Sequence, residues 1–449
     1  MSSTENAGAV SKISAWLERN VGPVVDIVQQ ERWRPAWFAT VQTAHGLLKL
    51  YVRSDRPEGL PTRPLSHEYA VLTLLQRQGI PVPRLYGWCE DPEAIVMAAS
   101  DDHPFHGGAD SDPELHRIVQ DYVAILARIH RIPLADVAAA GLEIPTSAED
   151  IALAYFRLAD RSYQAGKAGP EPLIEFLRGW VLRNIPQHRS SAALLVADAP
   201  QFFHDGRDVT AIYDLEMAHV GDPMMELASI RVRDINEPIG DMPSLLRRYE
   251  AETGEPIDWA ALDFHTIVSF LAVPMMVGAT LRADHPQPAF IEYLSWILAS
   301  SRAALEALAE TLGVELDPPV ELTARRSLHA DALADLVAVA QALPPPAGLL
   351  REAPVLSLAH YARRADEIGG EIERLERQET QALLGRDFES DQAAEAALEA
   401  FVRERGAQHE EALVRMFHRR VMRRLQLIRD YPAPIVTRGL GATRGFAPA

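Results

Sequence analysis

One stretch near the middle of the chain, residues 194–227, constrains the fold more than any other part of the sequence. A short apolar run, Leu194–Val196, predicts a strand that leads into an irregular turn. Residues 202–203 and 209–213 are apolar segments separated by Asp205-Gly206, which favours a tight hairpin because glycine accepts positive φ. The stretch therefore predicts a strand, a turn and a hairpin in immediate succession.

Two acidic residues mark the ends of these predicted strands. Asp198 lies in the turn after the first strand, and Asp214 follows the hairpin directly. Phosphoryl transfer uses such a pair, because one carboxylate takes the proton of the attacking hydroxyl and another holds Mg²⁺ on the phosphates. The alternative for either residue is a turn aspartate that only accepts hydrogen bonds from backbone N–H groups. The pattern makes Asp198 a candidate general base and Asp214 a candidate Mg²⁺ ligand.

The order of residues here resembles the aminoglycoside phosphotransferase and choline-kinase-like family, whose fold is that of protein kinases. Its members carry a His-Gly-Asp catalytic loop, an Asn a few residues later, a hairpin, then Asp-Trp-Glu and Gly-Asp-Pro. The matching pieces here are Val196-Ala197-Asp198, Gln201, Asp214-Leu215-Glu216 and Gly221-Asp222-Pro223. The chain departs from the pattern where Val196 replaces His and Gln201 replaces Asn, and its loop is shorter.

The resemblance assigns roles around the catalytic loop. Gln201 stands at the family's Asn position and at a similar spacing from Asp214, so its amide oxygen is the candidate second Mg²⁺ ligand. The shortening then lies between Asp198 and Gln201, close to the general base. Asp222 is expected to bond backbone near the loop, whereas Glu226 is expected only to continue a helix.

Bulk composition excludes several classes of protein. The 63 acidic and 44 basic residues give a formal net charge of −19, which argues against nucleic acid or an anionic membrane as the main partner. The single cysteine, Cys89, excludes an internal disulfide and fits a reducing compartment. We see neither a signal peptide nor an apolar run long enough to span a membrane, so we expect a cytoplasmic location.

Residues 1–99 are predicted to form a small nucleotide-binding lobe. Strands are expected near 24–29, 37–43 and 47–52, and alternation in the last one puts Lys49, Tyr51 and Arg53 on one face. A helix capped by Ser66 is expected to follow.

In such a lobe a basic strand residue grips the nucleotide phosphates and is oriented by a helix glutamate. The resemblance implies Arg53 for the first role, with Lys49 as the rival, and Glu68 for the second. Met97 falls at the hinge. The alternative is that Lys49 and Arg53 are solvated charges and that Glu68 is a surface helix residue.

The turn before the second strand contains no glycine, although the family places a glycine-containing turn there to bring N–H groups to the phosphates. Arg32 and Arg34 could instead contact an anion through charge-assisted hydrogen bonds. Alternatively, Trp33 and Trp37 could plug the nucleotide cleft.

Residues 100–343 are predicted to form a mostly helical large lobe that holds the acceptor substrate. Asp112 caps and Pro113 opens a helix with a clear apolar stripe that ends at His130. We interpret His130 as a core or capping histidine rather than as a catalytic one.

Residues 344–449 form a predicted helical extension after a proline-rich boundary. Between Arg403 and Arg429 eight arginines accompany three glutamates. These arginines could be solvated, or they could dock onto an acidic surface of the same chain or of a second copy in a homodimer. The residues from Tyr431 onward are expected to be loosely ordered.

The sequence thus predicts an α+β, bilobal protein-kinase-like fold with an added C-terminal helical segment. The function it favours is an ATP- or GTP- and Mg²⁺-dependent kinase that phosphorylates a hydroxyl of a small molecule. The alternative is a catalytically silent ligand-binding or scaffolding protein that uses its C-terminal helices as an interface.

Overall fold

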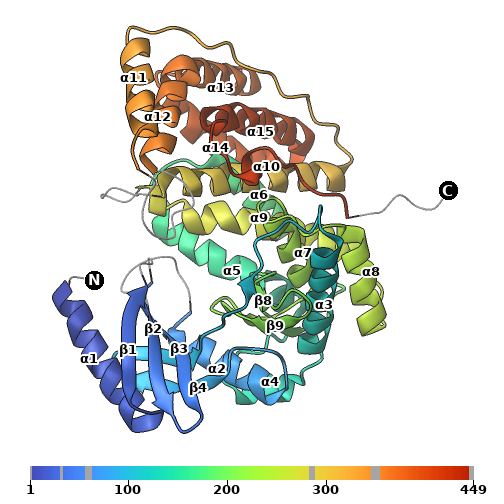
Figure 1. Ribbon diagram of the computed structural model, residues 1–449. Coiled ribbons are helices and arrows are strands. Elements are labelled where there is room, and N and C mark those ends of the chain that lie inside the picture. Colours follow the sequence, from blue (N-terminus) through green and yellow to red (C-terminus); the bar gives the residue numbers. More distant parts are fainter. Residues whose placement is uncertain (1–2, 31–33, 56–62, 283–288, 345–353, 444–449) are drawn as a thin grey trace. The chain divides into compact units, whose positions relative to one another are not determined.

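The structure is a computed structural model that describes residues 3–30, 34–55, 63–282, 289–344 and 354–443 (Figure 1). These residues divide into two compact units. Unit 1 comprises residues 1–146, 191–226 and 239–256, and unit 2 comprises residues 147–190, 227–238 and 257–449. The division of the sequence at residues 99 and 343 stays a prediction.

Unit 1 begins with an antiparallel five-stranded sheet in the order β1-β2-β3-β5-β4. Its strands are β1 Val24–Gln30, β2 Ala36–Thr43, β3 Gly46–Ser54, β4 Leu85–Glu90 and β5 Glu93–Ala98. Helix α1, Ser3–Asn20, lies along this sheet (Figure 1) and buries Ile13, Trp16 and Leu17 against it. Strands β1 to β3 match the predicted ones to within a residue or two.

One face of this sheet is covered and the other carries the candidate site residues. Trp37 packs in the core beneath α1, whereas its neighbour Phe38 points to the opposite face and is 45% exposed. Helix α2, Leu65–Arg77, supplies Glu68 from the adjoining segment. The predicted cap at Ser66 is wrong, because the helix already begins at Leu65 after Pro64, whose extended backbone precedes the first turn.

The rest of unit 1 holds the hairpin that leads to Asp214. Strands β8 Phe202–His204 and β9 Val209–Ile212 form the predicted hairpin, and Gly206 adopts the positive φ of 91° that the turn requires. The remaining strands are β6 His103–Pro104, β7 Ala193–Leu195 and β10 His219–Gly221. The helices are α3 Pro113–His130, α4 Leu134–Ala139 and α8 Met242–Thr253. Asp112 caps α3 as predicted, accepting bonds from the N–H groups of the first turn.

Unit 2 is helical throughout its described residues. Its helices are α5 Ala148–Gly166, α6 Pro172–Arg183, α9 Trp259–Val277, α10 Phe290–Leu312, α11 Ala330–Gln341, α12 Pro354–Arg364, α13 Gly370–Leu384, α14 Asp391–Arg405 and α15 Glu410–Leu425. Helix α7, Pro223–Asp234, begins in unit 1 and continues into unit 2. In the extension the sequence predicts two long helices, near 358–375 and 413–428; they are present as α12–α13 and α15, and α14 was not predicted.

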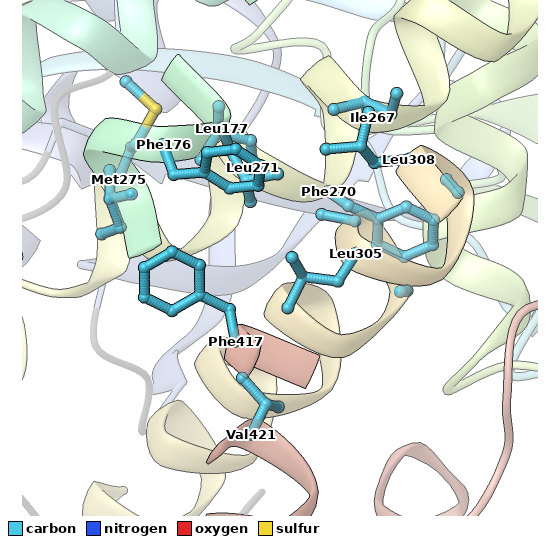
Figure 2. Close-up of a cluster of buried hydrophobic side chains, with 14 of the residues drawn as sticks. Phe176, Leu177, Ile267, Phe270, Leu271, Met275, Leu305, Leu308, Phe417 and Val421 are labelled. Carbon is cyan, nitrogen blue, oxygen red and sulfur yellow. The ribbon is translucent and has the colours of Figure 1, made fainter. Parts of the chain in front are cut away.

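Most of the buried apolar side chains of unit 2 belong to one core, and a smaller cluster joins α11 and α12. Figure 2 shows Phe176 of α6, Met275 of α9 and Phe417 of α15 in one buried cluster. The rings of Phe176 and Phe417 lie 5.6 Å apart between their centroids. The C-terminal helices therefore complete the core of α6, α9 and α10 and do not form a core of their own.

Helix α9 with the turn after it, Trp259–Arg282, is long and apolar enough to span a membrane. Within the described residues it is the one segment of this kind, and 67% of its apolar window is buried among the neighbouring helices. Packing in the unit 2 core explains its composition. The cytoplasmic location stays a prediction.

The arginine-rich face of α15 is neutralised inside unit 2. We define the helix cluster as the ion-paired residues on and around this face: Arg419, Arg420, Arg423, Arg424, Asp317, Glu376, Glu379 and Glu395. Glu379 alone accepts hydrogen bonds from three arginines of α15. Of the alternatives for these arginines, the contacts support docking onto the same chain, and a homodimer stays a prediction.

The prediction that the chain is loosely ordered from Tyr431 onward is wrong for residues 431–443. Arg302 of α10 donates hydrogen bonds to the carbonyls of Ile435, Val436 and Arg438. Arg231 of α7 donates to the carbonyl of Gly441 at 2.7 Å. Both arginines are buried, and their hydrogen bonds to backbone carbonyls hold the segment in place although it is rich in glycine and proline.

Candidate active site

The turn that carries Asp198 is fixed by a buried carboxylate. Glu226 in the first turn of α7 is fully buried and accepts hydrogen bonds from the N–H groups of Val196 (2.5 Å) and Ala197 (3.0 Å). Ala197 has a positive φ of 68°, a conformation that residues other than glycine rarely adopt. The two bonds to Glu226 therefore hold a strained turn directly before Asp198.

The role of Glu226 was missed at the sequence level. We expected it only to continue a helix, and we expected Asp222 to bond the backbone near the loop. Asp222 accepts a bond from the N–H of Met224 at the start of α7. The signal that could have revealed Glu226 is its place within the first turn after Gly-Asp-Pro, between the apolar residues Met225 and Leu227, where a buried acidic residue needs a donor.

Asp198 and Gln201 form one hydrogen-bonded pair. The side-chain amide of Gln201 donates to a carboxylate oxygen of Asp198 at 2.6 Å. The backbone carbonyl of Gln201 accepts from the N–H of Tyr213, which connects the loop to the residue before Asp214. The short loop therefore remains joined to the end of the hairpin.

Asp214 lies at the end of β9 with a positive φ of 62°. Its carboxylate is 2.5 Å from the guanidinium of Arg53, and its side chain is 30% exposed. The predicted general base and the predicted metal ligand thus belong to one unit, each directly after a strand.

Arg53 joins three carboxylates. Its guanidinium lies 3.2 Å from Glu68 of α2 and 3.0 Å from Glu216, in addition to Asp214. Arg34 contacts Glu216 as well and lies 3.6 Å from Glu68. We call Arg34, Arg53, Glu68, Asp214 and Glu216 the site cluster.

The site cluster holds more acids than bases, and its pKa values reflect this. Burial raises the pKa of Glu68 to about 7, because the charge of Arg53 offsets only part of the desolvation and Asp214 adds repulsion. Burial would lower the pKa of Arg53, but the charges of Asp214 and Glu68 outweigh it and raise the pKa. Binding of a cation, or loss of the proton from Glu68, would therefore change the net charge of the site cluster.

The structure places the remaining candidates differently. Lys49 is 62% exposed and pairs with Asp101 at the surface. Met97 is buried in β5, paired across the sheet with Tyr51. Arg32 lies outside the described residues, as does Trp33.

One alternative for the glycine-free turn was that Trp33 and Trp37 plug the nucleotide cleft. This is wrong for Trp37, which is buried under α1 on the far face of the sheet. The face that carries Arg53 instead holds a row of apolar side chains. Val28, Phe38, Tyr51 and Met97 are cross-strand neighbours along this row, and the rings of Phe38 and Tyr51 lie 5.2 Å apart.

Magnesium is the metal that this chemistry implies. Among the described residues no three acidic, histidine or cysteine side chains converge into a ready metal site. Mg²⁺ often takes only one or two protein oxygens beside phosphates and water. The partly exposed carboxylate of Asp214 and the amide oxygen of Gln201 are donors of the right kind, so the residues present fit this ion.

Comparison with known proteins identifies the family. A model of the phosphotransferase enzyme family matches residues 35–265, more than half of the chain. The chain therefore belongs to this family. No curated protein sequence gives a significant match.

A solved structure shows the same fold, and others resemble the chain more weakly. A provisionally named aminoglycoside phosphotransferase from Ralstonia eutropha is similar with a TM-score of 0.53 and 17% identity over 66% of this chain and 97% of its own. A choline kinase from Streptococcus pneumoniae has a TM-score of 0.48 and 13% identity over 67% and 99%. A macrolide 2′-phosphotransferase from Brachybacterium faecium has a TM-score of 0.44 and 19% identity over 70% and 100%.

These findings confirm the resemblance to aminoglycoside phosphotransferases and the protein-kinase-like fold with extra C-terminal helices. Family membership supports a phosphotransferase that acts on a small molecule.

Proposed function

We propose that the protein is an ATP- or GTP- and Mg²⁺-dependent kinase that phosphorylates a hydroxyl group of a small molecule. The observation that carries this proposal is the pair formed by Arg53 on β3 and Glu68 on α2, 3.2 Å apart, beside Asp214. Protein kinases require a β3-lysine–helix-glutamate pair together with a metal-binding aspartate. Arginine serves here in place of lysine and offers a bidentate fork to phosphate oxygens.

Each residue then has a distinct task. Asp198 accepts the proton of the acceptor hydroxyl, and its bond to Gln201 fixes the carboxylate that receives it. Asp214 and Gln201 would hold Mg²⁺, which neutralises charge on the transferring phosphoryl group. Arg53, with Arg34 from the turn before β2 and Arg32 earlier in the sequence, would bind the phosphates in place of backbone N–H groups.

The nucleotide base has an apolar surface available next to Arg53. Phe38 is 45% exposed and its ring adjoins that of Tyr51, in the same cross-strand row as Met97. Aromatic rings stack on any base, so this row accommodates adenine or guanine without selecting between them.

The first experiment is a thermal unfolding scan with ATP or GTP, with and without Mg²⁺, on the wild type and on Asp214→Ala. Nucleotide at a hundred times its dissociation constant should stabilise the folded state by about 2.7 kcal/mol. We expect a Mg²⁺-dependent shift that disappears in Asp214→Ala. Lys49→Ala is the matched control, because this exposed surface residue should leave the shift unchanged.

Turnover is then measured with a panel of hydroxyl acceptors that includes an aminoglycoside, a macrolide and choline. Asp198→Asn should lower kcat by roughly 10²- to 10⁴-fold, the usual contribution of a general base. If the wild type binds nucleotide with Mg²⁺ but phosphorylates none of these acceptors, other classes of hydroxyl acceptor are tested next. Absence of any nucleotide shift would contradict the proposal.

The second candidate is a binding or scaffolding protein without turnover. The observation that favours it is the occupation of both arginines by carboxylates of the same site, Arg53 by Asp214 and Arg34 by Glu216. This candidate predicts no nucleotide shift and, if the C-terminal helices form an interface, self-association that variants of exposed α12 residues such as Val355→Asp abolish.

A further inference from the structure

A buried histidine lies directly behind Glu226. His130 ends helix α3, and its side chain is 4% exposed. Its Nδ1 is 2.7 Å from the hydroxyl of Tyr249 on α8, and its Nε2 is 3.7 Å from a carboxylate oxygen of Glu226. The contact with Glu226 is too long for a hydrogen bond, so it is an electrostatic one.

The environment of the ring favours one arrangement of its hydrogens. If Tyr249 donates its hydroxyl hydrogen to Nδ1, then Nε2 carries the ring's hydrogen and turns a positive edge toward Glu226. The opposite arrangement would set a lone pair of Nε2 against a carboxylate. A hydrogen-bond partner on one ring nitrogen commonly fixes the role of the other in this way.

Glu226 needs such support because it is a fully buried carboxylate. Its oxygens accept from two backbone N–H groups, of Val196 and Ala197, and among the described residues His130 is the one basic side chain within 4 Å of them. A buried carboxylate that loses its compensating partners is displaced toward other donors or solvent, and such a movement is the change that matters here. It would release the two N–H groups of the strained turn.

We propose that His130 and Tyr249 are positioning residues, which hold Glu226 in place and thereby fix the turn that carries Asp198. The chain of contacts runs from Tyr249 to His130, to Glu226, and to the N–H groups directly before Asp198. The catalytic consequence rests on the proposed function, whereas the effect on the turn does not. Val196 stands where the family pattern has His, and this support from behind keeps the turn ordered.

A second histidine on α3 provides the matched control. His116 also connects α3 to α8, since its Nε2 lies 2.8 Å from the hydroxyl of Ser244. It makes no contact with Glu226. His116→Gln therefore disturbs the same pair of helices without touching the catalytic turn.

The experiment measures hydrogen exchange of the peptide that covers residues 194–199 in the full-length protein. The variants are Tyr249→Phe, which removes one oxygen, His130→Gln, which keeps a donor, and His130→Leu, which keeps none. We expect exchange in this peptide to accelerate most in His130→Leu, less in Tyr249→Phe and least in His130→Gln. Exchange in His116→Gln should equal that of the wild type.

Kinetics give the second readout. His130→Leu should lower kcat by roughly tenfold, part of the 10²- to 10⁴-fold that a general base supplies, with KM for the acceptor unchanged. His130→Gln should restore part of this loss.

Wild-type exchange in His130→Leu, or equal acceleration in His116→Gln, would overturn the proposal. If the wild type turns over no acceptor, the proposed function fails, and the exchange data still decide whether His130 holds the turn.

Discussion

Two groups of arginines and carboxylates form the same kinds of ion pair, but the pKa of an acid at the centre of each shifts in opposite directions. In the site cluster, Arg34 and Arg53 face three acids, and burial raises the pKa of Glu68 to about 7. In the helix cluster, burial would also raise the pKa of Glu379, but hydrogen bonds and charges from Arg423 and Arg419 outweigh it and lower the pKa.

The difference lies in how completely each acid is compensated. Glu379 receives three arginines, whereas Glu68 shares two arginines with two other acids. A satisfied cluster stabilises the fold, and an acid-rich cluster keeps a capacity for an added cation. Perturbed acids next to a reactive carboxylate are typical of functional sites.

The largest effect on stability should come from the satisfied cluster. Glu379→Gln leaves Arg423 buried without its carboxylate, so the free energy of unfolding should fall by about 3 kcal/mol. Urea denaturation measures this change. Glu411→Gln is the control, because its pair with Arg415 is exposed and should change stability by less than about 0.5 kcal/mol. Equal effects in both variants would remove the distinction between the clusters.

In the site cluster, Glu68→Gln should have only a small effect on the free energy of unfolding. The substitution removes a desolvated acid while Arg53 keeps Asp214 and Glu216, so stability should change by less than about 1 kcal/mol. Nucleotide binding should weaken, because Arg53 loses the residue that orients it. If Glu68→Gln instead lost much stability and kept its nucleotide affinity, Glu68 would stabilise the fold and not orient Arg53.

The pH dependence of stability should separate the two kinds of acid. The native state keeps the proton on Glu68 up to about pH 7, whereas the unfolded chain releases it near 4.5. The native state therefore binds more protons in this window, and the free energy of unfolding falls as pH rises from 4.5 to 7. Glu68→Gln should remove this slope.

Glu175 of unit 2 provides the contrasting case. Burial would raise its pKa, but hydrogen bonds from Arg403, Lys167 and Tyr163 lower it to about 2. Its stabilising contribution is complete above pH 4.5 and is lost as pH falls toward 2. Equilibrium unfolding of Glu175→Gln against the wild type should show a difference that shrinks over this acidic window. A constant difference would contradict the assignment.

Local patterns in the sequence predicted most of the architecture around the site. The hairpin, the cap at Asp112 and the common face of Lys49, Tyr51 and Arg53 follow from turn chemistry and alternation, which act over a few residues. The motif order predicted the family for the same reason, because its residues are close in sequence.

The contacts that sequence reasoning missed join distant segments. Glu226 bonds Val196 across 30 positions, and Arg34 reaches Glu216 across 182. The tail after Tyr431 looked loosely ordered because its composition is rich in glycine and proline, yet buried Arg231 and Arg302 bind its carbonyls. No local pattern encodes a partner that only the folded chain brings near.

The shared core of unit 2 has a consequence for how the protein is made. Phe270 and Phe417 belong to the same buried cluster, yet the ribosome adds Phe417 long after Phe270. At 5–20 residues per second the delay is roughly 7 to 30 s. During this interval α6, α9 and α10 expose apolar faces that α14 and α15 later cover. The nascent chain should therefore depend on chaperones, and rare codons before residue 413 should lower the yield of folded protein.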